Sequence, residues 1–346
     1  MRFVVDVLHP IDSHFFHYFI DEMSRRGHEF IVTSRDKECA VELLDAFGIE
    51  HTMLTRRQYG LVRKVGELAV RVRGMVKLAK EFDPDYLLSM TGPVIALAGQ
   101  FMRAKPLVFH DNEDPRLLNR TICRLSDLYA VPQSFRDDVG RNMVRYPGYQ
   151  QLAYLHPNWF TPNLDVVRKH GLLEDRPLYI VRFVLHDAYH DVGEHGLTMD
   201  DKRHIVKMLS EKGRVVITSE EDLPDEFKPY QLAIPYEDIH HVMAYAELLV
   251  GESCSMAAEA SVLGTHAFYI ATTQYGWVDD IEERYGLAHS YKDDQAALAI
   301  KNIEAMMARD DLKADAQERA ARLTAEQCDL TQWMIDYIEK DSGVKL

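Results

Sequence analysis

The stretch that decides the fold lies at residues 3–33 and reads FVVDVLHPIDSHFFHYFIDEMSRRGHEFIVT. It opens with a β-branched run at 3–8, continues with an amphipathic segment at 15–26, and closes with a second β-rich run at 29–33. Gly27 follows the amphipathic segment, and glycine is common just past the end of a helix. Strand, helix and strand in this order predict a βαβ unit on a parallel sheet.

The same alternation continues along the first third of the chain. We expect further strands at 50–54, 86–90, 107–110 and 128–131, and helices at 37–47 and 61–81. Residues 1–150 are therefore predicted to form one doubly wound, Rossmann-like domain.

Proline and glycine interrupt the pattern between Tyr146 and Pro177, which indicates a domain boundary and a linker at 151–177. The βα rhythm then resumes, and it predicts a second Rossmann-like domain at 178–325 and a final helical segment at 326–346. The second domain has expected strands at 178–184, 215–218, 231–234, 248–250 and 266–270, and expected helices at 199–212 and 255–263. The predicted class is α/β, with two domains that face a cleft.

Composition narrows the classes of function. The chain has 346 residues, and its 40 Lys and Arg against 55 Asp and Glu give a formal net charge of −15. A hydrophobic fraction of 47% excludes a disordered chain. The acidic balance argues against a nucleic-acid partner, which requires clustered cations. We expect a small-molecule partner.

The cysteines and the N-terminal residues indicate the cellular compartment. Cys39, Cys123, Cys254 and Cys328 are far apart and form no CxxC pair, as is typical of a reducing environment. The N-terminal apolar run is too short for a signal peptide, and no stretch approaches the roughly 18 apolar residues of a membrane span. We expect a cytoplasmic protein.

The strongest candidate site is GESCSMAAEASVLG at 251–264, which is predicted to run from a strand through a small polar turn into a helix. A helix N-terminus with nearby hydroxyls suits a diphosphate, and Glu259, one turn beyond Ser255, could accept two ribose hydroxyls. The alternative is a serine N-cap before a core helix with Glu259 solvated. The segment contains neither GxGxxG nor a Walker A loop.

A second candidate, RFVLHDAYHDVG at 182–193, follows an expected buried strand. Arg182 could bind a phosphate, and His190 with Asp191 could form a hydrogen-bonded pair at a sugar. His186 and His190 have metal-ligand spacing only if the segment is helical, and Gly193 favours a loop, so we expect no metal site.

The loop at 9–17, HPIDSHFFH, is the third candidate. His14 is a reasonable general base for an acceptor hydroxyl, whereas His17 is equally well explained as a packed core histidine. Asp12 or Ser13 would be the helix N-cap. Glu220, after the strand expected at 215–218, is a further nucleotide-binding candidate, with a solvated loop charge as the alternative.

A cationic segment stands out in this acidic chain. It is either a solvated helix face or a surface that docks on anionic lipid headgroups or a lipid-linked acceptor. Its members are Arg56, Arg57, Arg63, Lys64, Arg71, Arg73 and Lys77.

Several ordered motifs together resemble one known family, the domain of unknown function 354 proteins. The motifs are the segment 9–35, YPGYQQLAYLHPNWFTPN at 146–163, RFVLHDAYHDVGEHGL at 182–197, VVITSEEDLP at 215–224 and GESCSMAAEASVLGT at 251–265. That family is itself similar to GT-B glycosyltransferases and to non-hydrolysing UDP-N-acetylglucosamine 2-epimerases. The resemblance implies a nucleotide on the C-terminal domain, a ribose-binding role for Glu259, and a last helix that crosses back to the N-terminal domain.

Two departures from these relatives matter. The chain reads Gly264-Thr265-His266 where the family usually has Gly-Thr-Pro. The epimerase acids are not convincingly present, because the loop at 91–93 is Thr-Gly-Pro and the Asn119-Arg120 pair lacks preceding acids. The first difference concerns only the local turn, whereas the missing acids favour a transferase over an epimerase.

We therefore expect a metal-independent, GT-B-like glycosyltransferase that uses a nucleotide-diphosphate sugar, with UDP as the nucleotide, and no other cofactor. His14 would act as base, His190 and Asp191 would orient the sugar, and Arg182 would neutralise the leaving diphosphate. The acceptor would be lipid-linked or a polysaccharide, with peripheral contact at the inner membrane face. An epimerase and a non-catalytic nucleotide-sugar binding protein are the alternatives. The nucleotide would be held by Ser253, Cys254, Ser255, Met256, Glu259 and Glu220.

Overall fold

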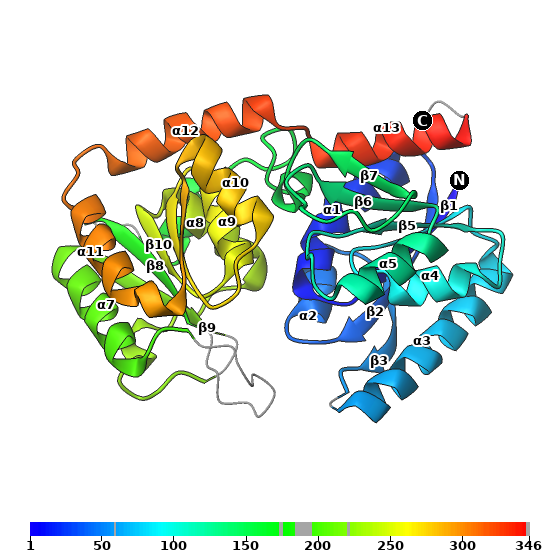
Figure 1. Ribbon diagram of the computed structural model, residues 1–346, viewed down its shortest axis with the longest axis horizontal. Helices are drawn as coiled ribbons and strands as arrows, with labels where there is room; N and C mark the ends of the chain where they lie inside the picture. Colours follow the sequence, from blue (N-terminus) through cyan, green and yellow to red (C-terminus); the bar gives the residue numbers. More distant parts are fainter. Residues whose placement is uncertain (59, 173–175, 184–195, 220–221, 344–346) are drawn as a thin grey trace. The chain divides into compact units, whose positions relative to one another are not determined.

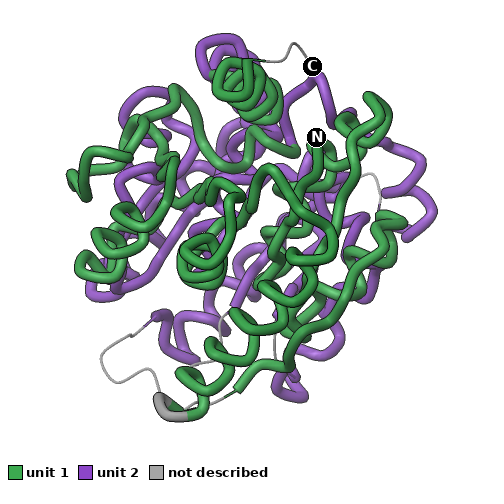
Figure 2. Tube along the Cα trace, turned by 90° about the vertical axis from the view of Figure 1, so that its right-hand side faces the viewer, with its two compact units in different colours: residues 1–154, 328–346 green, residues 155–327 purple. Residues whose placement is uncertain are grey.

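The computed structural model describes residues 1–58, 60–172, 176–183, 196–219 and 222–343 (Figure 1). The chain divides into two compact units, coloured separately in Figure 2. Unit 1 comprises residues 1–154 and 328–346, and unit 2 comprises residues 155–327. The predicted α/β class, with two parallel sheets in Rossmann-like domains, is confirmed.

Unit 1 is built on a parallel sheet of seven strands in the order β3-β2-β1-β4-β5-β6-β7. The strands expected from the sequence are all present, and β7 was missed because its four residues lie among turn signals. The strands are β1 (Arg2–Val7), β2 (Glu29–Asp36), β3 (His51–Arg56), β4 (Tyr86–Ser89), β5 (Lys105–Phe109), β6 (Leu128–Pro132) and β7 (Met143–Tyr146).

Helices cover both faces of this sheet, because neighbouring residues of β1 point to opposite sides. Phe3 packs against Phe19 of α1, with ring centroids 5.8 Å apart, whereas Val4 belongs to a core cluster with Met75 of α3. On the first face lie α1 (Pro10–Arg25), α2 (Ala40–Ala46), the short 3-10 helix η1 (Gln150–Ala153) and α13 (Leu330–Ser342); on the second lie α3 (Leu61–Phe82), α4 (Pro93–Gly99) and α5 (Arg116–Leu125) (Figure 1).

The last helix, α13, belongs to unit 1 although it follows unit 2 in the sequence. The Thr331 hydroxyl donates to the carbonyl of Ala153 at 2.8 Å. Near the other end of α13, the Asp341 carboxylate accepts from the Tyr86 hydroxyl at 2.7 Å and from Lys105 Nζ at 2.8 Å. Buried apolar residues of α13 complete the attachment to the first face of the sheet.

A buried charged network fastens α3 to the sheet. Arg71 is only 2% exposed and forms an ion pair with the fully buried Asp6 of β1. Its guanidinium also donates to the Ser34 carbonyl and to the Thr55 hydroxyl, each at 3.1 Å. The interpretation of Arg71 as part of a solvated cationic face is therefore wrong, since helical periodicity turns it toward β1 and β2.

We expect Arg71→Ala to lower the free energy of unfolding by about 3–5 kcal/mol, because it leaves the Asp6 carboxylate buried without its cation. Arg73→Ala is the matched control, since Arg73 lies two residues away on the same helix and is exposed. It should change stability by less than about 0.5 kcal/mol. Urea unfolding of both variants checks this, and equal midpoints would show that the buried pair does not hold α3.

Unit 2 contains a parallel sheet of five strands in the order β12-β11-β10-β8-β9. The strand expected at 231–234 is wrong, because Gln231 forms only an isolated bridge with Ile217 and Pro235 follows at once. The edge strand β12 was not predicted. The strands are β8 (Leu178–Phe183), β9 (Arg214–Ser219), β10 (Leu248–Gly251), β11 (His266–Ile270) and β12 (Ala288–Tyr291).

Two helices pack on one face of this sheet, α7 (Met199–Lys212) and α11 (Ala296–Met307), around a core that includes Val181 and Phe183 (Figure 1). The segment expected as a linker, 151–177, contains α6 (Leu164–Lys169), which packs against α8. The opposite face carries α8 (Ile239–Tyr245), α9 (Cys254–Val262), α10 (Gly276–Tyr285) and α12 (Leu312–Glu326).

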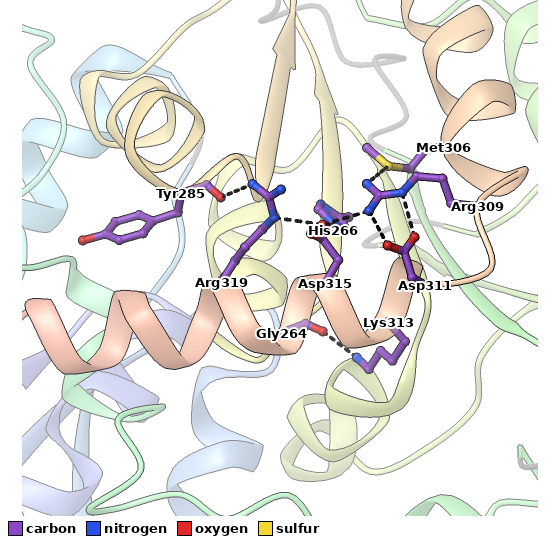
Figure 3. Close-up of polar contacts among 9 residues, drawn as sticks. All are labelled: Gly264, His266, Tyr285, Met306, Arg309, Asp311, Lys313, Asp315 and Arg319. Atoms are coloured by element: carbon purple, nitrogen blue, oxygen red, sulfur yellow. Dashed lines mark hydrogen bonds and ion pairs between the residues drawn. The ribbon is translucent and has the colours of Figure 1, made fainter.

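Polar contacts attach α12 to this second face (Figure 3). Asp315 lies 3.0 Å from His266 Nε2 and accepts from Arg319 at 2.8 Å. Lys313 Nζ donates to the carbonyls of Ala246 and Gly264 at 2.8 and 2.7 Å, and burial lowers its pKa to about 7. His266, at the start of β11, is therefore a partner of α12.

Candidate functional site

The turn between β10 and α9 brings the ends of two neighbouring strands unusually close. Gly251 pairs in register with Arg182 of β8, and a Cβ at Gly251 would lie 2.1 Å from the Arg182 carbonyl oxygen. The Glu252 amide donates to the same carbonyl at 3.0 Å. Only glycine fits this position, so the turn from β10 into α9 passes directly over the carboxyl end of β8.

The first turn of α9 follows this close approach. Ser253 is the N-cap, and its hydroxyl accepts from the Met256 amide at 3.4 Å. Cys254, Ser255 and Met256 form the first turn and are partly exposed. The amides and hydroxyls at this end of the helix are the groups that favour an anion, because the helix dipole adds partial positive charge there.

Arg182 and Thr218 occupy paired positions at the carboxyl ends of β8 and β9. The Thr218 hydroxyl lies 3.8 Å from Met256 Sδ in α9. Arg182 alternates with the buried core residues Val181 and Phe183, so it lies on the face of the sheet that α9 covers. The structure thus brings Arg182 together with the first turn of α9.

Glu259 is not solvated. The residue is 7% exposed, and its carboxylate lies 3.2 Å from His240 Nε2 of α8. That alternative interpretation is therefore wrong, and His240 is a member of the site that sequence reasoning missed. The adjacent histidines at 240 and 241 were the available signal, but nothing in the local pattern connects them with a helix that begins more than ten residues later.

Glu252 was also missed, and its role is to hold the turn. Its carboxylate accepts from the Leu197 amide at 2.8 Å and lies 3.1 Å from the buried Lys202 Nζ of α7. The pair joins the β10–α9 turn to α7. Two buried charges that satisfy each other in this way provide a rigid base for the exposed residues that follow.

The loop after β1 in unit 1 differs from the expectation. The N-cap of α1 is His9, followed by Pro10, so Asp12 and Ser13 lie inside the helix. The Asp12 carboxylate accepts from the Leu8 amide at 2.7 Å, and burial raises its pKa to about 7. Proline at the first helical position favours helical backbone angles, so α1 begins earlier than the candidate caps Asp12 and Ser13 predicted.

His14 lies between two aromatic rings of unit 1. Its ring centroid is 5.3 Å from that of Phe47 and 5.5 Å from that of Tyr154. The ring of His17 stacks on Phe47 with centroids 4.1 Å apart, and burial lowers the pKa of His17. The stacking agrees with the packed interpretation of His17, although both histidines are partly exposed.

The acidic loop after β5 contains two titratable groups with shifted pKa values. Burial, together with the charge of Glu113, raises the pKa of Asp111 to about 7, and burial lowers the pKa of His110 to about 4. Asn119 Nδ2 donates to the carbonyls of Asn112 and Glu113 at 2.8 and 3.2 Å. Asn119 therefore shapes this loop.

Three predicted site residues, His190, Asp191 and Glu220, lie outside the described residues. Within the described ranges, the structure contains no group of three or more His, Cys, Asp or Glu side chains arranged to hold a metal ion. Nor does any helix in this part of the chain combine the length and apolarity needed to cross a bilayer.

We expect Gly251→Ala to destabilise the protein by about 1–3 kcal/mol, because the added methyl group meets the Arg182 carbonyl. Gly66→Ala is the control: Gly66 is an exposed residue of α3, and a Cβ added there would meet no other atom within 4 Å. That change should be stabilising by about 0.5–1 kcal/mol, since glycine weakens a helix interior. Thermal unfolding measures both, and a neutral Gly251→Ala variant would contradict the close approach.

Comparison with known proteins identifies a family and a fold. The model of a family described as "Protein of unknown function (DUF354)" matches residues 1–305. The uncharacterized protein MJ0665 of Methanocaldococcus jannaschii is 18% identical over 273 residues, which cover 75% of this chain and 79% of that protein.

Two solved structures share the architecture. A UDP-GlcNAc 2-epimerase from Neisseria meningitidis, bound to UDP-GlcNAc, superposes with a TM-score of 0.66 at 12% identity, and the match covers 98% of this chain and 100% of that one. The spinosyn rhamnosyltransferase SpnG, complexed with thymidine diphosphate, gives 0.61 at 15% identity, with 95% and 98% covered. At these identities the likeness establishes the GT-B fold alone.

Proposed function

The chain belongs to the DUF354 family, and from this premise we propose that it is a glycosyltransferase that takes its sugar from a nucleoside-diphosphate sugar. The observation that carries the proposal is the placement of Arg182 beside the first turn of α9, with the buried Glu259 farther along that helix. UDP and thymidine diphosphate, the nucleotides named for the two solved structures, are the first candidates, and we favour UDP.

The diphosphate would lie at the N-terminus of α9. The amides and the Ser253 and Ser255 hydroxyls supply donors, and the Arg182 guanidinium supplies the compensating positive charge. We propose that this charge replaces a divalent cation in stabilising the leaving diphosphate.

Glu259 would bind the ribose. A carboxylate can accept two hydroxyl hydrogen bonds, and His240, 3.2 Å away, holds it in one orientation. Because the pair is already assembled on α8 and α9, little side-chain entropy is lost when the nucleoside binds.

In the transfer step an acceptor hydroxyl oxygen attacks the anomeric carbon of the donor. The bond from that carbon to the diphosphate oxygen breaks, the nucleoside diphosphate leaves with the electron pair, and the hydroxyl proton passes to His14. His190 and Asp191 are proposed to orient the donor sugar. The donor is a substrate, and the proposal includes no resident cofactor.

We expect Glu259→Gln to weaken UDP binding about tenfold or more, because an amide loses one of the acceptor sites and the charge that ribose hydroxyls favour. Glu304→Gln, an exposed carboxylate on α11 of the same unit, is the control and should bind UDP as the wild type does. Titration calorimetry with UDP, GDP, CMP and TDP, with and without Mg²⁺, measures this. Absence of binding to every nucleotide would remove the basis of the proposal.

We expect His14→Ala to lower the release of UDP from a UDP-sugar by about a hundredfold while leaving UDP affinity unchanged, since general base catalysis typically contributes that much. His17→Ala is the control, because His17 lies on the same helix as His14 and its ring also packs against Phe47. Assays would use lipid-linked and polysaccharide acceptors. Unchanged turnover in His14→Ala would show that another group takes the proton.

An epimerase is the second candidate, and Asp111 favours it. A carboxyl group with a pKa of about 7 at the carboxyl end of β5 can both take up and return a proton near neutral pH. An epimerase needs no acceptor, so NMR of a UDP-sugar with the protein alone separates the two activities. Binding without any turnover would instead indicate a nucleotide-sugar binding protein.

A further inference from the structure

The exposed face of α3 carries a concentration of positive charge in unit 1 that the proposed function does not use. The helix buries Glu67, Arg71, Met75 and Ala79, which recur every four residues. Its exposed residues include four cations outside this buried stripe, which helical periodicity directs away from the sheet. We call this set the α3 outer face; its cations are Arg63, Arg73, Lys77 and Lys80.

The cations of the α3 outer face are not neutralised by the protein. In the described ranges none of the four forms an ion pair with another side chain. The acids of α3 are Glu67, which is buried against Arg35, and Glu81 at the C-terminal end. A protein with a net charge of −15 therefore presents a local basic strip on α3.

Aliphatic side chains are interleaved with these cations. Val65 is 60% exposed and Val70 is 53% exposed, and Met53 of the adjacent edge strand β3 is 41% exposed. Branched apolar side chains on an exposed helix are unfavourable in water, and burial in an apolar layer stabilises them. Bases of a nucleic acid would instead be stacked on aromatic side chains.

We propose that the α3 outer face docks this protein on a bilayer surface rich in anionic phospholipid. The strip from Arg63 to Lys80 is about 26 Å long on one helix, so all its cations can meet one plane. Lysine and arginine stems reach the headgroups while Val65 and Val70 enter the boundary with the acyl chains. The inference goes beyond the proposed function and does not depend on it.

The buried ion pair of Arg71 with Asp6 explains how α3 can stay attached to the sheet while its outer face remains available to a bilayer. Glu67 and Arg71 attach α3 to β1 and β2 through ion pairs, and Met75 of the same stripe packs in the apolar core. The helix therefore does not need Val65 and Val70 for attachment to the sheet. The outer face is therefore a rigid surface, and no ordering of the helix is needed when it meets the bilayer.

The test is flotation of the full chain with vesicles of phosphatidylcholine alone and with about 30% phosphatidylglycerol added, which is on the order of the anionic content of a charged leaflet. We expect binding only to the anionic vesicles, and loss of binding at about 0.5 M NaCl because salt screens the attraction. Equal binding to both vesicle types, or to neither, would overturn the proposal.

Charge variants locate the surface. The variant R63Q/R73Q/K77Q/K80Q should lower the partition coefficient by more than about a hundredfold, since each basic residue near such a leaflet contributes a factor of roughly five. The charge-preserving variant R63K/R73K/K77R/K80R should bind as the wild type does. The matched control K169Q/K207Q/K212Q/K301Q removes four exposed lysines of unit 2 and should retain binding. Equal losses in the test and control variants would show that net charge alone governs binding and would overturn the assignment to α3.

A further variant tests whether the aliphatic residues enter the bilayer. V65S/V70S should weaken vesicle binding several-fold, because a hydroxyl gains nothing from the acyl boundary; unchanged binding would overturn the insertion of these residues.

Two measurements test for other occupants of this face: light scattering detects a dimer, and tRNA anisotropy detects nucleic-acid binding. A charge-dependent dimer, or tRNA binding as tight as vesicle binding, would assign the face to a second copy or to a nucleic acid and so overturn the lipid assignment.

Discussion

The close approach of Gly251 to the Arg182 carbonyl is the constraint on which the candidate site depends. A side chain at position 251 would place its Cβ 2.1 Å from that oxygen, so the backbone of β10 can reach this position only without one. The approach directs the chain from β10 across the end of β8 and sets the start of α9 at Ser253. The phosphate-binding role proposed for α9 and the charge-compensating role proposed for Arg182 both depend on this contact, which makes them neighbours.

Buried polar and charged pairs hold helices in both units. Glu252 with Lys202, Glu259 with His240, and Arg71 with Asp6 each join a helix to a neighbouring element. Such pairs add little net stability over an apolar replacement, but an unpaired member is costly. Apolar contacts of Met75 complete the attachment of α3, and Val65 and Val70 lie outside its buried stripe.

Sequence periodicity predicted the regular elements well where they are long or strongly patterned, as for β1, α1 and β2. It failed at the short edge strands β7 and β12, whose four residues carry no alternation that distinguishes them from turns. It also predicted a strand at 231–234, where the chain makes a single bridge to the sheet. Arg71 was placed on the wrong face because charge outweighed helical spacing in that interpretation.

The sequence by itself determined the α/β class, the two domains and the candidate motif at 251–264, since these follow from local periodicity and from glycine and proline positions. Only the tertiary structure decided that Glu259 pairs with His240, that Glu252 supports the turn, and that Arg71 is buried. The physical reason is that each of these pairs joins side chains from separate elements. Local spacing fixes which residues share a helix face, but parallel pairing of distant strands and helix packing fix which faces meet.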